Sequence, residues 1–296
     1  ISYLRCHFPC CMISQSKLLL LTPPFTQLNT PYPATAYIKG FLNTLGVPSQ
    51  QADLGIEVIL ALFSPQGVKR LFNTLDEAEH DIELADNAYR IYLLRDDYIA
   101  TIEPVILFWQ NKSPTLAHSI CDRTYLPEAN RFKEVEDLEW AFGAMGTQDK
   151  ARHLATMYLE DLGDFIQEAI DPHFGFSRYA ERLGRTATHF DELHASLQAT
   201  DTLITSLLIE LLEKRIKAFQ PTIVCLTIPF PGNLFGAFKC GQYIKQHYPD
   251  IKIVMGGGFC NTELRSLSDP RVFDYVDFVC LDDGEAPLRS LLEYLE

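Results

Sequence analysis

The sequence lacks several patterns that would place it in a familiar functional class. No apolar run approaches the roughly 20 residues that a membrane-spanning helix needs. No charged start, apolar centre and small-residue cleavage site marks a secretory signal. Basic residues are few: 25 Lys and Arg stand against 39 Asp and Glu, which gives a formal charge of −14. Because phosphate contacts require a basic face, we expect no nucleic-acid binding. The lack of a long apolar run and of a secretory signal leads us to expect a cytoplasmic protein that does not bind a membrane.

Nucleotide-binding motifs are also missing. There is no Gly-x-x-x-x-Gly-Lys-Ser/Thr loop, and no Gly-x-Gly-x-x-Gly follows the first expected strand. The eight cysteines do not form a disulfide framework, because the last four recur at intervals of 15 to 20 residues, as buried thiols would. Cys6, Cys10 and Cys11 are too few to supply all the ligands of a zinc or iron–sulfur site. We expect residues 1–16 to be a disordered leader or an artificial extension.

Short apolar runs closed by chain breakers alternate with amphipathic stretches. The runs predict five strands, at 18–22, 47–53, 222–227, 251–255 and 277–281. The amphipathic stretches between them predict helices, at 34–45, 203–219, 233–248, 263–267 and 288–295. Alternating strands and helices are typical of a parallel sheet covered on both faces. The predicted fold is therefore a flavodoxin-like (Rossmann-like) α/β domain of order 2-1-3-4-5, built from 17–56 plus 201–296.

A long insertion follows the second strand. Residues 57–200 are rich in helical patterns and hold 13 basic and 25 acidic residues, so most of the negative charge lies there. A structureless loop of this length is implausible, and we predict an all-helical subdomain. The insertion starts at the carboxyl end of a parallel strand, where such sheets bind ligands. A wall of a substrate cavity and a passive packing or dimer-contact domain both remain open as its role.

The turns at the carboxyl ends of the strands are rich in prolines, aromatics and glycines. Such turns stiffen the chain and let its backbone approach a ligand closely. The composition favours a flat, apolar cofactor. The candidate cofactor-binding residues are Pro23, Pro24, Phe25, Thr227, Pro229, Asn233, Gly256, Gly257, Gly258, Phe259, Asp282, Gly284 and Glu285.

These turns carry a family resemblance. The Pro-Pro turn after strand one, the 227–233 turn, the glycines at 256–258 and the ending Asp-Phe-Val-Cys-Leu-Asp-Asp-Gly-Glu-Ala-Pro-Leu at 277–288 resemble the N-terminal cobalamin-binding domain of radical S-adenosylmethionine (radical SAM) enzymes. The resemblance covers 17–56 and 203–296. It implies a corrinoid across the carboxyl rim of the sheet, with its nucleotide tail near 227–233 and 256–260. Enzymes of this family cleave S-adenosylmethionine at an iron–sulfur cluster, and many are methyltransferases.

The sequence departs from the family pattern in two respects. The Asp-x-His-x-x-Gly segment of other corrinoid proteins is absent, so the resemblance implies a corrinoid without a lower histidine ligand. The Cys-x-x-x-Cys-x-x-Cys motif is also absent, and a 4Fe-4S cluster needs those thiolates. We therefore expect the cluster and S-adenosylmethionine to belong to a C-terminal barrel outside this chain. The chain by itself would bind, and not catalyse, with an unknown substrate for which a peptide is one candidate.

Two other functions remain open. A corrinoid-free α/β scaffold could present the acidic helical subdomain to a peptide or protein partner. A di-iron oxidase is the other, because a carboxylate and an imidazole three residues apart share a helix face. Its candidate ligands are Glu77, His80, Glu136, Glu139, Asp161, Asp164, Asp191 and His194.

Overall fold

The computed structural model describes residues 16–28, 32–77, 83–134, 146–176, 179–185 and 190–295. The chain divides into two compact units. The first, which we call the sheet unit, comprises 1–57, 176–200 and 208–296. The second, the helical unit, comprises 58–175 and 201–207. The leader cysteines Cys6, Cys10 and Cys11 lie outside the described residues.

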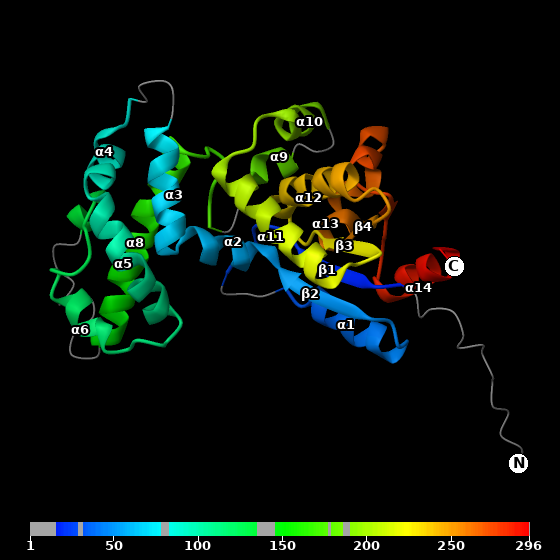
Figure 1. Cartoon of the computed structure of the whole chain (residues 1–296), viewed down its shortest axis with the longest axis horizontal. Coiled ribbons are helices and arrows are strands. Elements are labelled where there is room, and N and C mark those ends of the chain that lie inside the picture. The colour runs from blue at the N-terminus through cyan, green and yellow to red at the C-terminus, as the bar shows by residue number, and fades with distance from the viewer. Residues whose placement is uncertain are drawn as a thin grey trace, which may run out of the picture. The chain divides into compact units, whose positions relative to one another are not determined.

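The sheet unit is built on one five-stranded parallel sheet (Figure 1). Its strands are β1 (Leu18–Thr22), β2 (Ser49–Asp53), β3 (Ile223–Thr227), β4 (Lys252–Gly256) and β5 (Phe278–Val279). Their spatial order is β2-β1-β3-β4-β5, so the predicted α/β fold and strand order are confirmed. All five residues of β1 are buried, which explains why its sequence is a continuous apolar run.

Helices cover the sheet on both faces. On one face, α1 (Ala34–Thr44) and α14 (Glu285–Leu295) pack against alternate strand residues. Figure 1 shows α12 (Leu234–His247) on the opposite side of the sheet. The shorter helices of this unit are α9 (Glu181–Arg185), η4 (Pro231–Asn233), α10 (Phe190–Gln198), α13 (Gly258–Asn261), η5 (Glu263–Ser266) and η6 (Pro270–Asp274).

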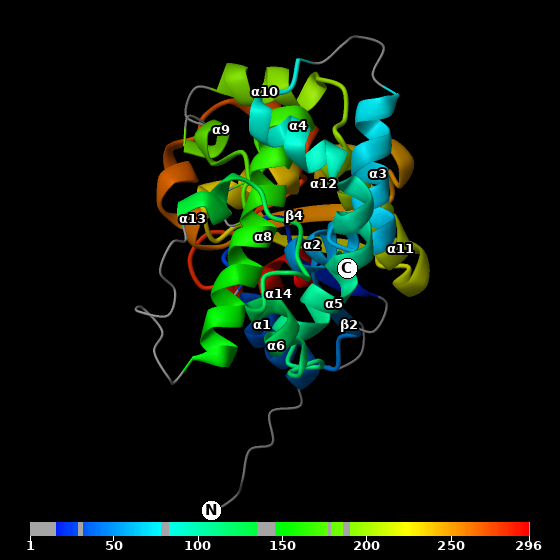
Figure 2. The same cartoon turned by 90° about the vertical axis from the view of Figure 1, so that its left-hand side faces the viewer.

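Helices follow strand 2, as the sequence predicts. The helical unit contains α3 (Pro65–Asp76), α4 (Asp86–Leu93), α5 (Arg95–Trp109), α6 (Leu116–Cys121), η2 (Asn130–Glu134) and α8 (Thr147–Ala169). Two further helices, α2 (Leu54–Leu62) and α11 (Leu203–Phe219), each contain one of the four chain boundaries between the units. Within the helical unit, α8 lies beside α4 and α6, and α3 lies beside α5 (Figure 2). None of the helices in the described ranges combines the length and apolar character that crossing a bilayer requires.

The sheet unit includes a segment that the sequence assigns to the insertion. Residues 176–200 belong to the sheet unit, whereas the predicted helical subdomain extends to residue 200. Tyr179 anchors this segment, because its ring meets the edges of Phe25 and Phe235 at centroid distances of 5.4 and 5.7 Å. Such aromatic contacts join residues far apart in the sequence, which local periodicity does not reveal.

Candidate functional site

A cavity of about 320 Å³ lies where β3, β4 and β5 end, and it reaches Leu20 in the middle of β1. We call it the rim pocket. Its floor is apolar: Leu20, Cys225 and Val254 lie side by side on adjacent strands. Ile38 of α1 and Leu288 of α14 line it as well. The cavity therefore reaches from the carboxyl edge of the sheet down between one sheet face and two helices, which suits a flat apolar group.

The thiols in this pocket are not activated. Burial raises the pKa of Cys225 far above its ordinary value, and burial also raises the pKa of Cys280. Both thiols are free and both line the cavity. Since the thiolate is the nucleophilic form, neither residue is suited to covalent catalysis near neutral pH.

The glycines after β4 form one edge of the pocket. Gly257 has φ +112°, and a Cβ there would lie 2.8 Å from the Ile228 carbonyl oxygen, so a side chain is excluded. At Gly258 a Cβ would have ordinary contacts, 3.4 Å from the Pro229 carbonyl oxygen and 3.8 Å from the Tyr32 hydroxyl. Gly258 therefore leaves an open space that a ligand or a larger side chain could fill.

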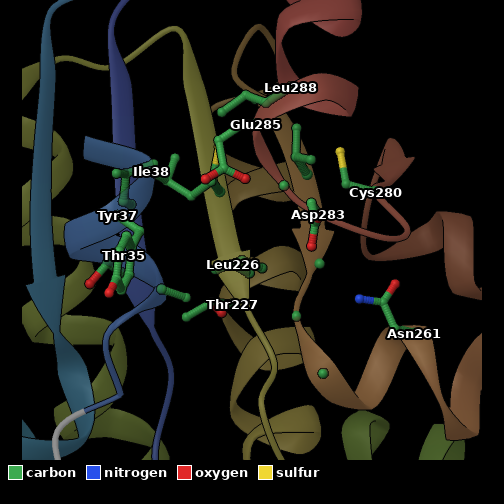
Figure 3. A pocket seen from close by; sticks show the side chains of 18 of the residues that line it. Thr35, Tyr37, Ile38, Leu226, Thr227, Asn261, Cys280, Asp283, Glu285 and Leu288 are labelled. Carbon is green, nitrogen blue, oxygen red and sulfur yellow. The ribbon is translucent and has the colours of Figure 1, made fainter. Parts of the chain in front are cut away.

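The neighbouring edge, formed by the loop after β5, is acidic. Asp282, Asp283 and Glu285 line the pocket, and no basic residue of the described chain is among its lining residues. Figure 3 shows Asp283 and Glu285 extending from the loop after β5, with Asn261 reaching toward that loop from α13. Carboxylates accept hydrogen bonds, so this edge favours ligand groups that carry N–H or O–H donors.

A second cavity of about 660 Å³ adjoins the first and shares Tyr32 and Gly258 with it. We call it the side pocket. Pro229, Phe230 and Phe259 line it together with residues of α9 and η5. The Phe230 side chain is 54 % exposed, although aromatic rings are usually buried. The two cavities lie next to each other at the carboxyl edge of the sheet, and we refer to them together as the recess.

The structure brings most of the candidate residues to this recess. Seven line the rim pocket: Thr227, Gly256, Gly257, Gly258, Asp282, Gly284 and Glu285. Pro229 and Phe259 line the side pocket. Sequence reasoning did not select Tyr32, Thr35, Ile38, Asn261 and Asp283, which line the rim pocket as well. In the sequence, Ile38 has the spacing of an ordinary core residue of an amphipathic helix. No sequence pattern around Asn261 indicates that it lines a cavity.

Four candidate residues, Pro23, Pro24, Phe25 and Asn233, line neither pocket. The Asn233 side chain is buried and donates a hydrogen bond to the Pro23 carbonyl oxygen at 2.6 Å. The Phe25 ring is fully buried, and its backbone N–H donates to the Gly232 carbonyl oxygen at 3.1 Å. These two hydrogen bonds join the turn after β1 to the turn after β3.

The candidate di-iron ligands do not form a metal site in the described part of the chain. Asp191 forms an ion pair with Arg271 at 2.7 Å, and the Tyr275 hydroxyl lies 2.8 Å from Nδ1 of His194. No three His, Cys, Asp or Glu residues among those described gather as metal ligands. Three members of the candidate set lie outside the described residues: His80, Glu136 and Glu139.

Comparison with known proteins returns no match to a family model, to a curated protein or to a solved structure. The function is therefore argued from the recess itself.

Proposed function

We propose that the sheet unit binds a corrinoid, cobalamin, in the recess formed by the rim and side pockets. In this proposal the chain is the cofactor-binding region of a radical SAM enzyme whose cluster-binding barrel lies outside it. The observation that carries the proposal is the rim pocket, which opens at the carboxyl ends of the parallel strands β3, β4 and β5 and continues down between the sheet and α1 and α14. Open parallel sheets bind ligands at this edge.

The residues of the recess fit the parts of a corrinoid. The rim pocket is too small for a whole corrinoid, but its apolar floor of Leu20, Cys225 and Val254 suits the flat base of the nucleotide tail. The acidic edge suits the primary amides and ribose hydroxyls, which donate hydrogen bonds. The macrocycle would then lie over the side pocket, against Tyr32 and Phe230.

No histidine of the described chain lines either pocket. The described residues therefore suit a corrinoid held by packing and by hydrogen bonds to its periphery, with no imidazole from these residues beneath the cobalt. When bound, a corrinoid supplies methyl-transfer chemistry, while the protein supplies binding and orientation. With protonated thiols and no histidine among the described residues that line the recess, the role of these residues is to bind and orient a ligand.

The test is retention of a corrinoid by the purified full chain. After incubation with hydroxocobalamin and desalting, we expect the wild-type protein to keep the absorption spectrum of the corrinoid. Gly258→Leu should abolish retention, because its side chain would enter the space that both pockets share. Gly40→Leu is the matched control, since a Cβ at that exposed position of α1 meets no atom within 4 Å.

A wild-type protein that elutes without colour would refute the proposal, and so would equal retention by the wild type and Gly258→Leu. The first result would leave the corrinoid-free scaffold as the candidate function. Loss of colour in Gly40→Leu as well would show that the Gly258→Leu result does not report on the recess.

A further inference from the structure

The loop that closes the rim pocket after β5 has an unusual backbone. Asp282 has φ +65°, in the left-handed region that residues other than glycine rarely adopt. The next residues, Asp283 to Glu285, line the pocket and lead into α14. A loop with such a conformation needs contacts that stabilise it, because the conformation is intrinsically unfavourable.

One side chain supplies these contacts. The Asp282 backbone N–H donates a hydrogen bond to Oδ1 of Asn261 at 2.5 Å. In return, Nδ2 of Asn261 donates to the Asp282 carbonyl oxygen at 3.2 Å. Asn261 is the last residue of α13, which begins at Gly258. A single amide therefore joins the loops after β4 and β5, which form two sides of the rim pocket.

Other contacts of the loop are weaker or of a different kind. Arg265 pairs with the Asp282 carboxylate at 2.9 Å, but both side chains are more than half exposed, and exposed ion pairs contribute little. At the far end of the loop, a Cβ on Gly284 would lie 2.8 Å from Cδ1 of Ile38, so the loop lies close against α1. The loop thus spans the pocket between α13 and α1, and the Asn261 amide holds one end.

We infer that Asn261 is a positioning residue that holds the loop after β5 as the closed wall of the rim pocket. Through Asp282 it directs Asp283 and Glu285 toward the bound ligand. Without the amide, the loop moves away from α13, the mouth of the cavity widens, and the apolar floor stays in place. The part of this inference that concerns ligand affinity rests on the proposed function, whereas closure of the pocket does not.

Closure is measurable in the ligand-free protein by thiol labelling. Cys280 lines the rim pocket, so its rate of reaction with a small maleimide reports access to the cavity. We expect Asn261→Ala to accelerate labelling of Cys280 about tenfold, because two hydrogen bonds are lost. Cys121, half-buried in the helical unit, should react at an unchanged rate, and fully buried Cys240 should stay slow unless the protein unfolds.

Two further variants test whether the effect on Cys280 labelling is specific to Asn261. Asn43→Ala, at an exposed position of α1, is the matched control and should leave the Cys280 rate unchanged. Arg265→Ala should change the rate by less than about threefold, in line with an exposed ion pair. An unchanged Cys280 rate in Asn261→Ala would overturn the inference. Parallel acceleration of Cys240 would overturn it too, because it would indicate general destabilisation.

The ligand measurement separates this inference from the proposed function. Hydroxocobalamin should slow Cys280 labelling in the wild type, and Asn261→Ala should need about a tenfold higher concentration for the same protection. Equal protection in both proteins would refute the positioning role. If hydroxocobalamin protects neither protein but Asn261→Ala still accelerates Cys280 alone, closure by Asn261 is supported and the corrinoid proposal fails.

Discussion

The helical unit contains a buried carboxylate whose titration should control the stability of that unit. Asp161, on α8, is fully buried. Its Oδ1 accepts a hydrogen bond from the Arg131 backbone N–H at 3.3 Å, whereas Oδ2 has no partner among the described atoms. The Tyr98 hydroxyl is also buried without a hydrogen-bond partner in the described structure. Burial raises the pKa of Asp161 to about 6, although nearby Arg131 opposes this and Asp164 adds to it.

The direction of the pH effect follows from this pKa. The folded protein binds the Asp161 proton more tightly than the unfolded chain, in which the carboxyl has its ordinary pKa of 3.8. The resulting stabilisation is complete below pH 3.8 and disappears as the pH rises through about 6. With these two values, the helical unit should be more stable at pH 5 than at pH 7.5 by about 1.4 kcal/mol.

Asp161→Asn is the informative change, because it keeps the shape of the side chain and removes its titration. We expect the variant to lose this pH dependence and to be at least as stable as the wild type at pH 7.5. Urea unfolding followed by tryptophan fluorescence is the suitable assay, since both tryptophans of the chain, at 109 and 140, lie within the range of the helical unit.

Asp149→Asn serves as the control, since Asp149 is an exposed carboxylate on the same helix. This variant should show the same difference between pH 5 and pH 7.5 as the wild type. The reasoning is refuted if Asp161→Asn and the wild type lose stability in parallel over this range. It is equally refuted if the wild type is more stable at pH 7.5 and Asp161→Asn abolishes that gain.

Two further predictions concern the packing beside the recess. Gly184→Ala should destabilise the sheet unit by about 2 kcal/mol or more, because its Cβ would lie 2.2 Å from the Pro231 carbonyl oxygen; an unchanged midpoint in urea unfolding followed by circular dichroism would contradict this. Asn233→Ala should cost about 1–3 kcal/mol in the same assay, since it leaves the buried Pro23 carbonyl oxygen without its side-chain donor; a variant of full stability that lost only corrinoid retention would instead make Asn233 a ligand contact.

The central strand β1 can be predicted from the sequence because all of its residues are buried. Leu18 to Thr22 form a strand covered on both faces, and a continuous apolar run followed by proline indicates such a strand directly. The edge strands are less predictable. The last strand is expected at 277–281, but the structure has only Phe278–Val279. Its neighbour Asp277 accepts a hydrogen bond from the Ile253 backbone N–H with its side chain, which a hydropathy pattern does not reveal.

The recess is predictable only in part, for a related reason. The glycines and carboxylates that follow β4 and β5 line it because parallel strands end at one edge. The same rule applied to the turns after β1 and β3 selects Phe25 and Asn233, which line neither cavity. The Phe25 ring packs against Tyr179, which belongs to a distant segment of the chain, and the Asn233 amide donates a hydrogen bond to the Pro23 carbonyl oxygen. A sequence pattern shows where the strands end. It does not show which of these strand ends are covered by another segment of the chain.

The burial of the turn after β1 gives its prolines a structural explanation. A buried turn must satisfy its backbone N–H groups, and proline has none. Pro23 and Pro24 therefore lower the number of donors in a region closed by packing, while the Asn233 amide donates a hydrogen bond to the Pro23 carbonyl oxygen. The turn after β4, with three consecutive glycines, lies where the recess is open. The prolines directly after β1 thus lie in the packed part of the carboxyl edge, whereas Pro229 and Pro231 after β3 line the side pocket and the glycines after β4 line the rim pocket. A ligand should therefore enter beside β3, β4 and β5.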